Sequence, residues 1–101
     1  MKRILLCCSA GMSTSMLVKK MQVAAKERGI ECEIQAKSVS EFDEDIAHYD
    51  VCLLGPQVRF QLDELRKVAT EHGKNIEAIS PQNYGMMKGE EVLEQALALI
   101  D

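Results

Sequence analysis

Short apolar runs alternate with longer segments of helical periodicity along the 101 residues of the chain. The apolar runs are predicted strands, and they cover residues 4–8, 31–36, 51–54 and 75–79. Segments whose apolar positions recur three and four residues apart are predicted helices, at 13–28, 39–49, 58–72 and 90–100. Gly29 and Gly73 stand where two of these helices are expected to stop, and residues 80–89 are predicted to form a loop.

The alternation of strands and helices indicates the fold class. Strands separated by helices pair in parallel through right-handed crossovers. The sequence therefore predicts an α/β fold, a three-layer sandwich around a four-stranded parallel sheet. For this sheet we take the strand order 2-1-3-4 as a hypothesis. We expect one domain over residues 1–101, because this length suits one core and no linker or repeat interrupts it. Ligands of such folds bind beyond the carboxyl ends of the strands, which selects residues 8–15, 36–40, 55–59 and 80–89.

Composition narrows the class of protein. An apolar fraction of 47% and a charged fraction of 28% are typical of a soluble domain, and the net charge of −4 argues against a general nucleic-acid binder. The apolar runs are far shorter than the ~18 residues that a membrane span requires. The basic and apolar N-terminus is interpreted as a strand, not a signal peptide. We therefore expect a cytoplasmic protein.

Four cysteines are candidates for chemistry, and their surroundings distinguish them. The sequence contains no CxxC motif and no Cys/His spacing typical of zinc, so we expect free thiols and neither a metal nor another cofactor. Cys7 should point to the opposite face of its strand from Cys8, into the core. Cys32 and Cys52 lie within predicted strands and are expected to be buried as small apolar residues.

A segment of small residues joins the first predicted strand to the first helix. In order, its residues are Cys8, Ser9, Ala10, Gly11, Met12, Ser13, Thr14 and Ser15. Small side chains let backbone N–H groups surround an anion, and the helix that follows adds its positive dipole end. The hydroxyl groups offer further donors. This Cys8 loop, residues 8–15, is thus predicted to hold a phosphate-sized anion and to stabilise the thiolate of Cys8. An inert cysteine at a strand end remains the alternative.

The Cys8 loop resembles the phosphorylation loop of the IIB component of the bacterial sugar phosphotransferase system, lactose/cellobiose class. The resemblance continues through residues 53–58 (LLGPQV) and Tyr84-Gly85. It implies that Cys8 is a phosphocysteine intermediate and that the protein is a phosphotransferase. The implied donor is a phosphohistidine of a IIA partner. The implied acceptor is a sugar, a β-disaccharide such as cellobiose, chitobiose or lactose, bound by a membrane IIC partner.

The fold and the loop also resemble low-molecular-weight tyrosine phosphatases, which carry a Cys-x5-Arg loop. The strand order 2-1-3-4 is taken from this similar fold. Thr14 occupies the position six after Cys8, so the guanidinium that would clamp phosphoryl oxygens is absent. Residues 80–89 contain no Asp or Glu that could act as the general acid. These absences favour a phosphocarrier over the alternative of a phosphatase or arsenate-reductase-like enzyme. A non-catalytic anion-binding module is the second alternative.

Several residues that follow the later strands are candidates for the rim of the site. Gln57 could bond a phosphoryl oxygen, Arg59 could add charge and Tyr84 could cover the phosphorylated sulfur. Met86 and Met87 are a flexible apolar pair; such side chains more often pack within their loop, but beside the site they would also suit a docking surface. Both histidines are expected at solvated helix ends, away from Cys8. The candidate rim or partner contacts are therefore Pro56, Gln57, Arg59 and Tyr84.

Overall fold

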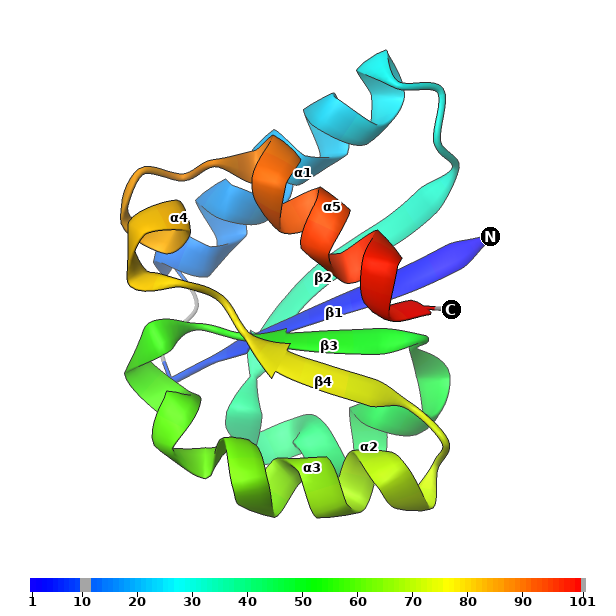
Figure 1. Ribbon diagram of the computed structural model, residues 1–101, viewed down its shortest axis with the longest axis vertical. Coiled ribbons are helices and arrows are strands. Elements are labelled where there is room, and N and C mark those ends of the chain that lie inside the picture. Colours follow the sequence, from blue (N-terminus) through cyan, green and yellow to red (C-terminus); the bar gives the residue numbers. More distant parts are fainter. Residues whose placement is uncertain (10–11, 101) are drawn as a thin grey trace.

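The structure is a computed structural model that describes residues 1–9 and 12–100. One sheet of parallel strands has the order β2-β1-β3-β4 (Figure 1). The strands are β1 (Lys2–Cys8), β2 (Cys32–Ser38), β3 (Val51–Leu54) and β4 (Asn75–Ala78). The predicted fold class and strand order are confirmed.

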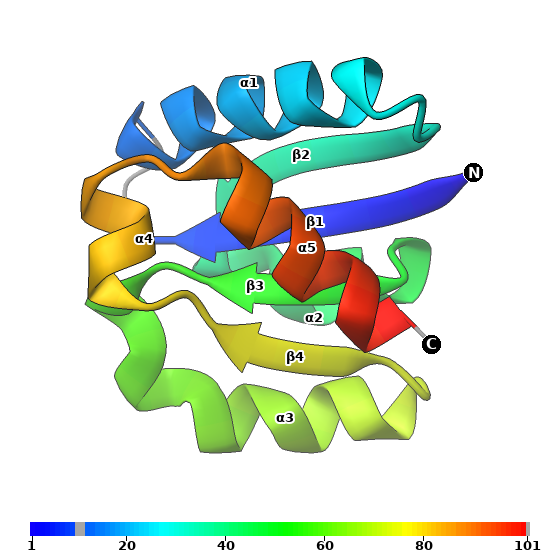
Figure 2. The same ribbon diagram turned by 45° about the horizontal axis from the view of Figure 1, so that its top comes forward.

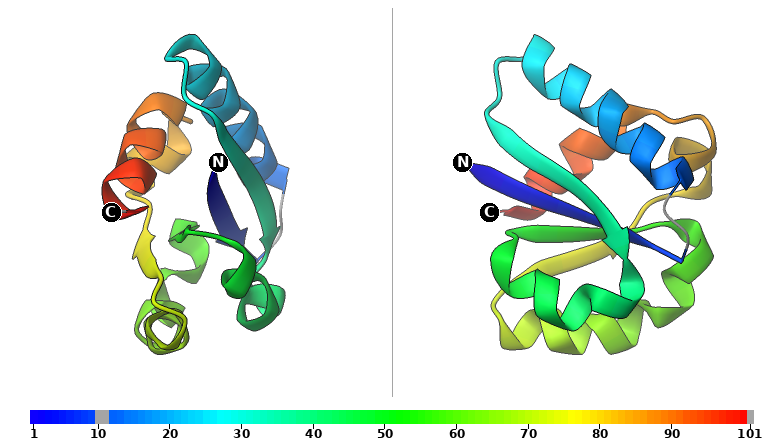
Figure 3. Two further views of the ribbon diagram at one scale, coloured as in Figure 1. Left: turned by 90° about the vertical axis from the view of Figure 1, so that its right-hand side faces the viewer. Right: turned by 180° about the vertical axis from the view of Figure 1, so that it is seen from behind.

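Helices cover both faces of the sheet, so the molecule has three layers (Figure 3). One face carries α1 (Met12–Glu27) and α5 (Gly89–Ile100), and the other carries α2 (Phe42–Asp45) and α3 (Leu62–Glu71). Short 3₁₀ turns adjoin α2 and α3, at Val39–Glu41, Ile46–His48 and Pro56–Gln61. No helix within the described ranges is long and apolar enough to cross a membrane.

The apolar core is divided by the sheet into two clusters, as strand alternation requires. Ile4 and Leu6 of β1 belong to the cluster under α1 and α5. Leu5 and Cys7 belong to the cluster under α2 and α3, so Cys7 faces away from the α1 side as predicted. Cys32 is half-buried, and its predicted burial is wrong because β2 is an edge strand with a neighbour on one side alone.

The predicted loop over residues 80–89 is wrong, because it contains the short helix α4 (Pro81–Gly85). Ser80 caps this helix, and its hydroxyl accepts a hydrogen bond from the N–H of Asn83 at 3.1 Å. A helix of five residues has no apolar stripe, so periodicity could not reveal it. The signal in the sequence is the cap itself, a serine followed by a proline at the first helical position.

Gly89 lets α5 begin directly against α1. A Cβ atom at Gly89 would lie 2.6 Å from the carbonyl carbon of Lys20 and 2.8 Å from the amide nitrogen of Met21. Because backbone atoms cannot swing aside, we expect Gly89→Ala to push the helices apart and destabilise the fold by about 1–3 kcal/mol. Denaturant unfolding measures this change. Gly85→Ala is the matched control, since a Cβ there meets open space, and equal midpoints for both variants would contradict the prediction.

Candidate active site at Cys8

The order of the strands places a topological switch point at the carboxyl end of β1. β2 pairs with one edge of β1, and β3 pairs with the opposite edge, so the direction in which strands are added reverses at β1. Ligands of α/β folds bind at such switch points. Cys8 ends β1 and Gly55 follows β3, where the Gly55 N–H donates to the carbonyl of Cys7 at 2.9 Å. Figure 2 shows that α4 and the start of α1 lie at this same end of the sheet.

Gly55 brings the predicted site residues together. A Cβ atom at Gly55 would lie 3.5 Å from the Cβ of Cys8, 3.5 Å from Cε1 of Tyr84 and 2.6 Å from Oε1 of Gln57. The missing side chain therefore leaves the space into which the Tyr84 ring and the Gln57 amide reach. Three segments that the sequence selected, the ends of β1 and β3 and residues 80–89, meet at this point.

The Cys8 loop leads directly into the first turn of α1. Cys8 is 1% exposed, whereas Ser9 is exposed and α1 begins at Met12. The first N–H groups of an α-helix have no carbonyl partner within the helix, so this turn directs donors towards the loop. Ala10 and Gly11 lie outside the described residues, as do the side chains of Met12 and Ser13. Ser15 is exposed on α1.

Thr14 has a different environment from the one that the sequence suggested. Its side chain is fully buried, and its hydroxyl lies 3.0 Å from the hydroxyl of Tyr84 in a hydrogen bond in which either can donate. The hydroxyl that we expected to face an anion is therefore engaged by α4. The position six after Cys8 is therefore a buried site whose side chain is bonded to Tyr84.

The other predicted rim residues follow β3. Pro56 is half-buried at the start of the 3₁₀ turn, and Gln57 is exposed. Arg59 is exposed and makes no ion pair with any residue that the structure describes, so its charge is available to a partner.

Sequence reasoning missed part of the exposed apolar surface. Phe60 is 80% exposed, Met86 is 69% exposed and Met16 is 55% exposed. They lie on the turn after β3, after α4 and in the first turns of α1, respectively, which are the segments that converge on the Cys8 end of the sheet. Met86 was anticipated, but Met87 packs against the core. Phe60 could have been found, because it lies out of phase with the buried positions of its own segment.

Comparison with known families decides the identity. The model of the family "PTS system, Lactose/Cellobiose specific IIB subunit" matches residues 3–95. This chain belongs to that family. IIB components are phosphotransferase components that work with IIA and IIC partners, and the resemblance found in the sequence is confirmed.

Curated relatives of this IIB chain cover nearly its whole length. It is 45% identical to the oligo-beta-mannoside-specific EIIB component of Bacillus subtilis and 48% identical to the galactose-specific EIIB component of Lactococcus lactis subsp. cremoris. It is 47% identical to the cellobiose-specific EIIB component of Lactococcus lactis subsp. lactis. Each alignment covers 99% of this chain and 97% of the relative.

Solved structures of the family share the fold. The lactose-specific IIB domain from Streptococcus pneumoniae matches with a TM-score of 0.89 at 19% identity, over 99% of this chain and 98% of that one. The cellobiose-specific IIB protein from Borrelia burgdorferi matches with a TM-score of 0.82 at 40% identity, over 98% of this chain and 91% of that one.

Cys32 and Cys52 of the IIB chain are in environments that favour neutral thiols. Burial, reinforced by a hydrogen bond with the Cys7 side chain, raises the pKa of Cys52 well above its ordinary value. Burial also raises the pKa of Cys32, against the opposing charge of Lys2. Neither side chain is suited to act as a nucleophilic thiolate at neutral pH.

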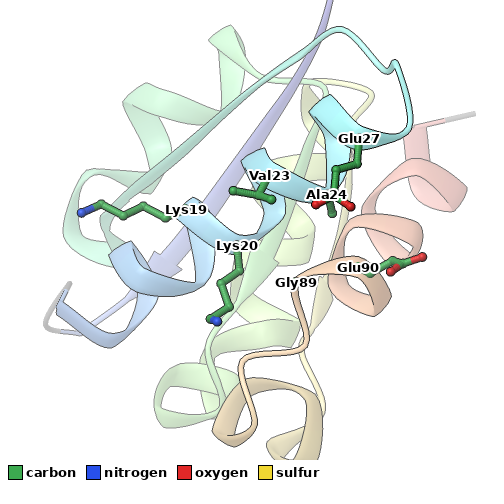
Figure 4. A pocket seen from close by; sticks show the side chains of 7 residues that line it. All are labelled: Lys19, Lys20, Val23, Ala24, Glu27, Gly89 and Glu90. Atoms are coloured by element: carbon green, nitrogen blue, oxygen red, sulfur yellow. The ribbon is translucent and has the colours of Figure 1, made fainter.

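A surface groove of about 350 Å³ lies between α1 and the start of α5, away from Cys8 (Figure 4). The charged side chains of Lys19, Lys20, Glu27 and Glu90 point in different directions in this view. They do not converge on one position, so the groove has no constellation that would bind a defined group.

Proposed function

We propose that Cys8 is the phosphocysteine of this IIB component, the carrier between a phosphohistidine of IIA and a sugar held by IIC. The observation that carries the proposal is the position of Cys8. Its thiol stands at the switch point of the sheet, beside the glycine after β3 and just before the first turn of α1. The backbone N–H groups of residues 9–15 are proposed to bind the phosphoryl oxygens, whereas the Thr14 hydroxyl bonds Tyr84.

The proposed reaction consists of two in-line displacements at phosphorus. In the first, the Cys8 thiolate forms the S–P bond as the N–P bond of phosphohistidine breaks, and the electron pair leaves with the imidazole. In the second, a sugar hydroxyl forms the O–P bond as the S–P bond breaks. The hydroxyl proton passes to a base of the partner, and the thiolate is regenerated. Helix N–H groups neutralise charge on the three equatorial oxygens in both steps.

The surroundings of Cys8 support transfer to a partner over transfer to water. Thr14, where a phosphatase of this fold would need an arginine, is buried against Tyr84. The segment that contains α4, residues 80–89, has no carboxylate that could activate water. A phosphoryl group on Cys8 is therefore expected to persist until an acceptor docks. No metal or other cofactor takes part in the proposed steps.

The sugar is proposed to be a β-disaccharide such as cellobiose, chitobiose or lactose, recognised by IIC. Relatives that are similar at 45–48% identity are named for cellobiose, galactose and oligo-beta-mannosides. Nearly equal similarity to proteins of different specificity supports the view that the sugar is selected outside this chain. We further propose that residues 1–101 act as one domain in the cytoplasm.

A phosphopeptide experiment tests the proposal. Purified chain is incubated with a phosphorylated IIA component, digested and examined by mass spectrometry under conditions that preserve thiophosphate. We expect one modified peptide, with the phosphoryl group on Cys8. Modification of a histidine or serine instead, or rapid turnover of an aryl phosphate by the protein alone, would favour the alternative functions.

The exposed apolar side chains of Phe60, Met86 and Met16 are proposed to contact the partners, because their segments lie at the Cys8 end of the sheet (Figure 2). Pro56, Gln57 and Arg59 are proposed to join them. Phe60→Ser should raise the KM for phosphorylated IIA about tenfold, because exposed aromatic anchors contribute strongly to interfaces. The maximal rate and the thermal midpoint should change little, since Phe60 is 80% exposed.

Val23→Ser is the matched control for the docking prediction. Val23 is 56% exposed but lies on α1 in the groove of Figure 4, more than two helical turns from Thr14. Its KM should stay within about twofold of the wild type. Equal effects of the two substitutions would contradict a docking surface around Cys8.

A further inference from the structure

The hydroxyl groups of Thr14 and Tyr84 join two segments that are 70 residues apart in the chain. Thr14 lies in the first turn of α1 and has no solvent-exposed surface. It is the one buried polar residue among those whose burial the structure describes. Tyr84, in α4, is half-buried, and its ring lies against Gly55 beside Cys8. A buried hydroxyl without a partner is costly, so this hydrogen bond fixes how α4 and α1 meet.

The segment that carries Tyr84 is itself firmly held. The Ser80 cap closes the start of α4. Its end closes through hydrogen bonds from the N–H of Met87 to the carbonyl of Tyr84 at 3.1 Å and from the N–H of Lys88 to the carbonyl of Asn83 at 2.9 Å. Met87 has φ of +49° at the position where glycine is usual, and it also packs against the core. Hydrogen bonds therefore hold both ends of the short helix that carries Tyr84.

We propose that Tyr84 and Thr14 form a latch that positions the first turn of α1, and with it the anion-binding N–H groups, relative to Cys8. Both are positioning residues, which act through the Cys8 loop and not on the phosphoryl group. The expected effect on the rate of phosphoryl transfer rests on the proposed function of Cys8. The expected effect on the position of the Cys8 loop does not. The competing account is that each hydroxyl bonds a phosphoryl oxygen separately.

A double-mutant cycle separates these accounts. Thr14→Val and Tyr84→Phe each remove one hydroxyl with little change of shape, and each should lower the maximal rate of phosphoryl uptake from IIA about tenfold. The KM for IIA should stay within about twofold. The double variant should be no slower than either single variant, because one hydrogen bond is lost in all three. Thr14→Ser, which keeps the hydroxyl, should restore most of the rate.

Amide hydrogen exchange reports on the latch without any phosphoryl transfer. Exchange at Thr14 and Ser15 should accelerate about tenfold in both single variants and by the same factor in the double variant. Tyr49→Phe is the matched control, because Tyr49 is 5% exposed but packs in the cluster under α2 and α3. It should change neither exchange at these amides nor uptake.

Losses in uptake that multiply in the double variant would overturn the latch in favour of two separate contacts with the phosphoryl group. Unchanged exchange at Thr14 and Ser15 in Tyr84→Phe would also overturn it, even if Thr14→Val fails to fold. If amide exchange became faster in the variants, while neither the wild type nor any variant took up a phosphoryl group, the latch would be supported and the proposed function refuted.

Discussion

Replacement of Cys8 by serine is expected to reduce phosphoryl uptake from IIA below detection, while the fold is retained. Serine differs from cysteine by one atom, so the small change of volume at a buried position costs little structure. The hydroxyl, however, ionises far less readily than a thiol and offers no comparable nucleophile at neutral pH. Uptake is measured from the transfer of labelled phosphate, and the fold is checked from the thermal midpoint.

The other cysteines supply controls for the Cys8 prediction. Cys7→Ala and Cys52→Ala remove buried thiols from the cluster under α2 and α3, and Cys32→Ser changes a half-buried one. All three should take up phosphate at rates close to that of the wild type. If the Cys8→Ser protein were phosphorylated, or if Cys52→Ala were not, the nucleophile would have to be assigned elsewhere.

Thr14→Arg is expected to destabilise the protein by at least about 3 kcal/mol and to create no phosphatase. The substitution reproduces the Cys-x5-Arg spacing, but Thr14 is fully buried against α4. A guanidinium there would be an unpaired buried charge, and the partner hydroxyl of Tyr84 would lose its hydrogen bond. Denaturant unfolding measures the loss, and the hydrolysis of an aryl phosphate should stay at the background rate.

Met16→Arg is the matched control for the Thr14 substitution. Met16 lies two residues further along α1 and is 55% exposed, so an arginine there remains solvated. Its free energy of unfolding should change by less than about 0.5 kcal/mol. A Thr14→Arg protein as stable as the Met16→Arg protein, with new hydrolysis of the aryl phosphate, would show that the lack of an arginine alone separates this chain from a phosphatase.

Two kinds of feature escaped prediction, and both depend on what surrounds a segment. The helix α4 is too short for a periodic pattern, so its cap was the sole signal for it. The half-burial of Cys32 follows from the position of β2 at the edge of the sheet, where the fold supplies a neighbouring strand on one side alone. A sequence pattern assigns an apolar residue to the core by default, whereas packing decides how much of it is covered.

The amino-acid sequence by itself determined the four strands, the longer helices and the Cys8 loop. Period-two and helical patterns record which face each local segment buries, so Cys7 could be placed opposite Cys8, and the loop was sufficient to indicate the family. Only the tertiary structure decided that Thr14 is buried and that its hydroxyl meets Tyr84 beside Gly55. These contacts join residues that are far apart in the chain, and no local pattern encodes which distant segments the fold brings together.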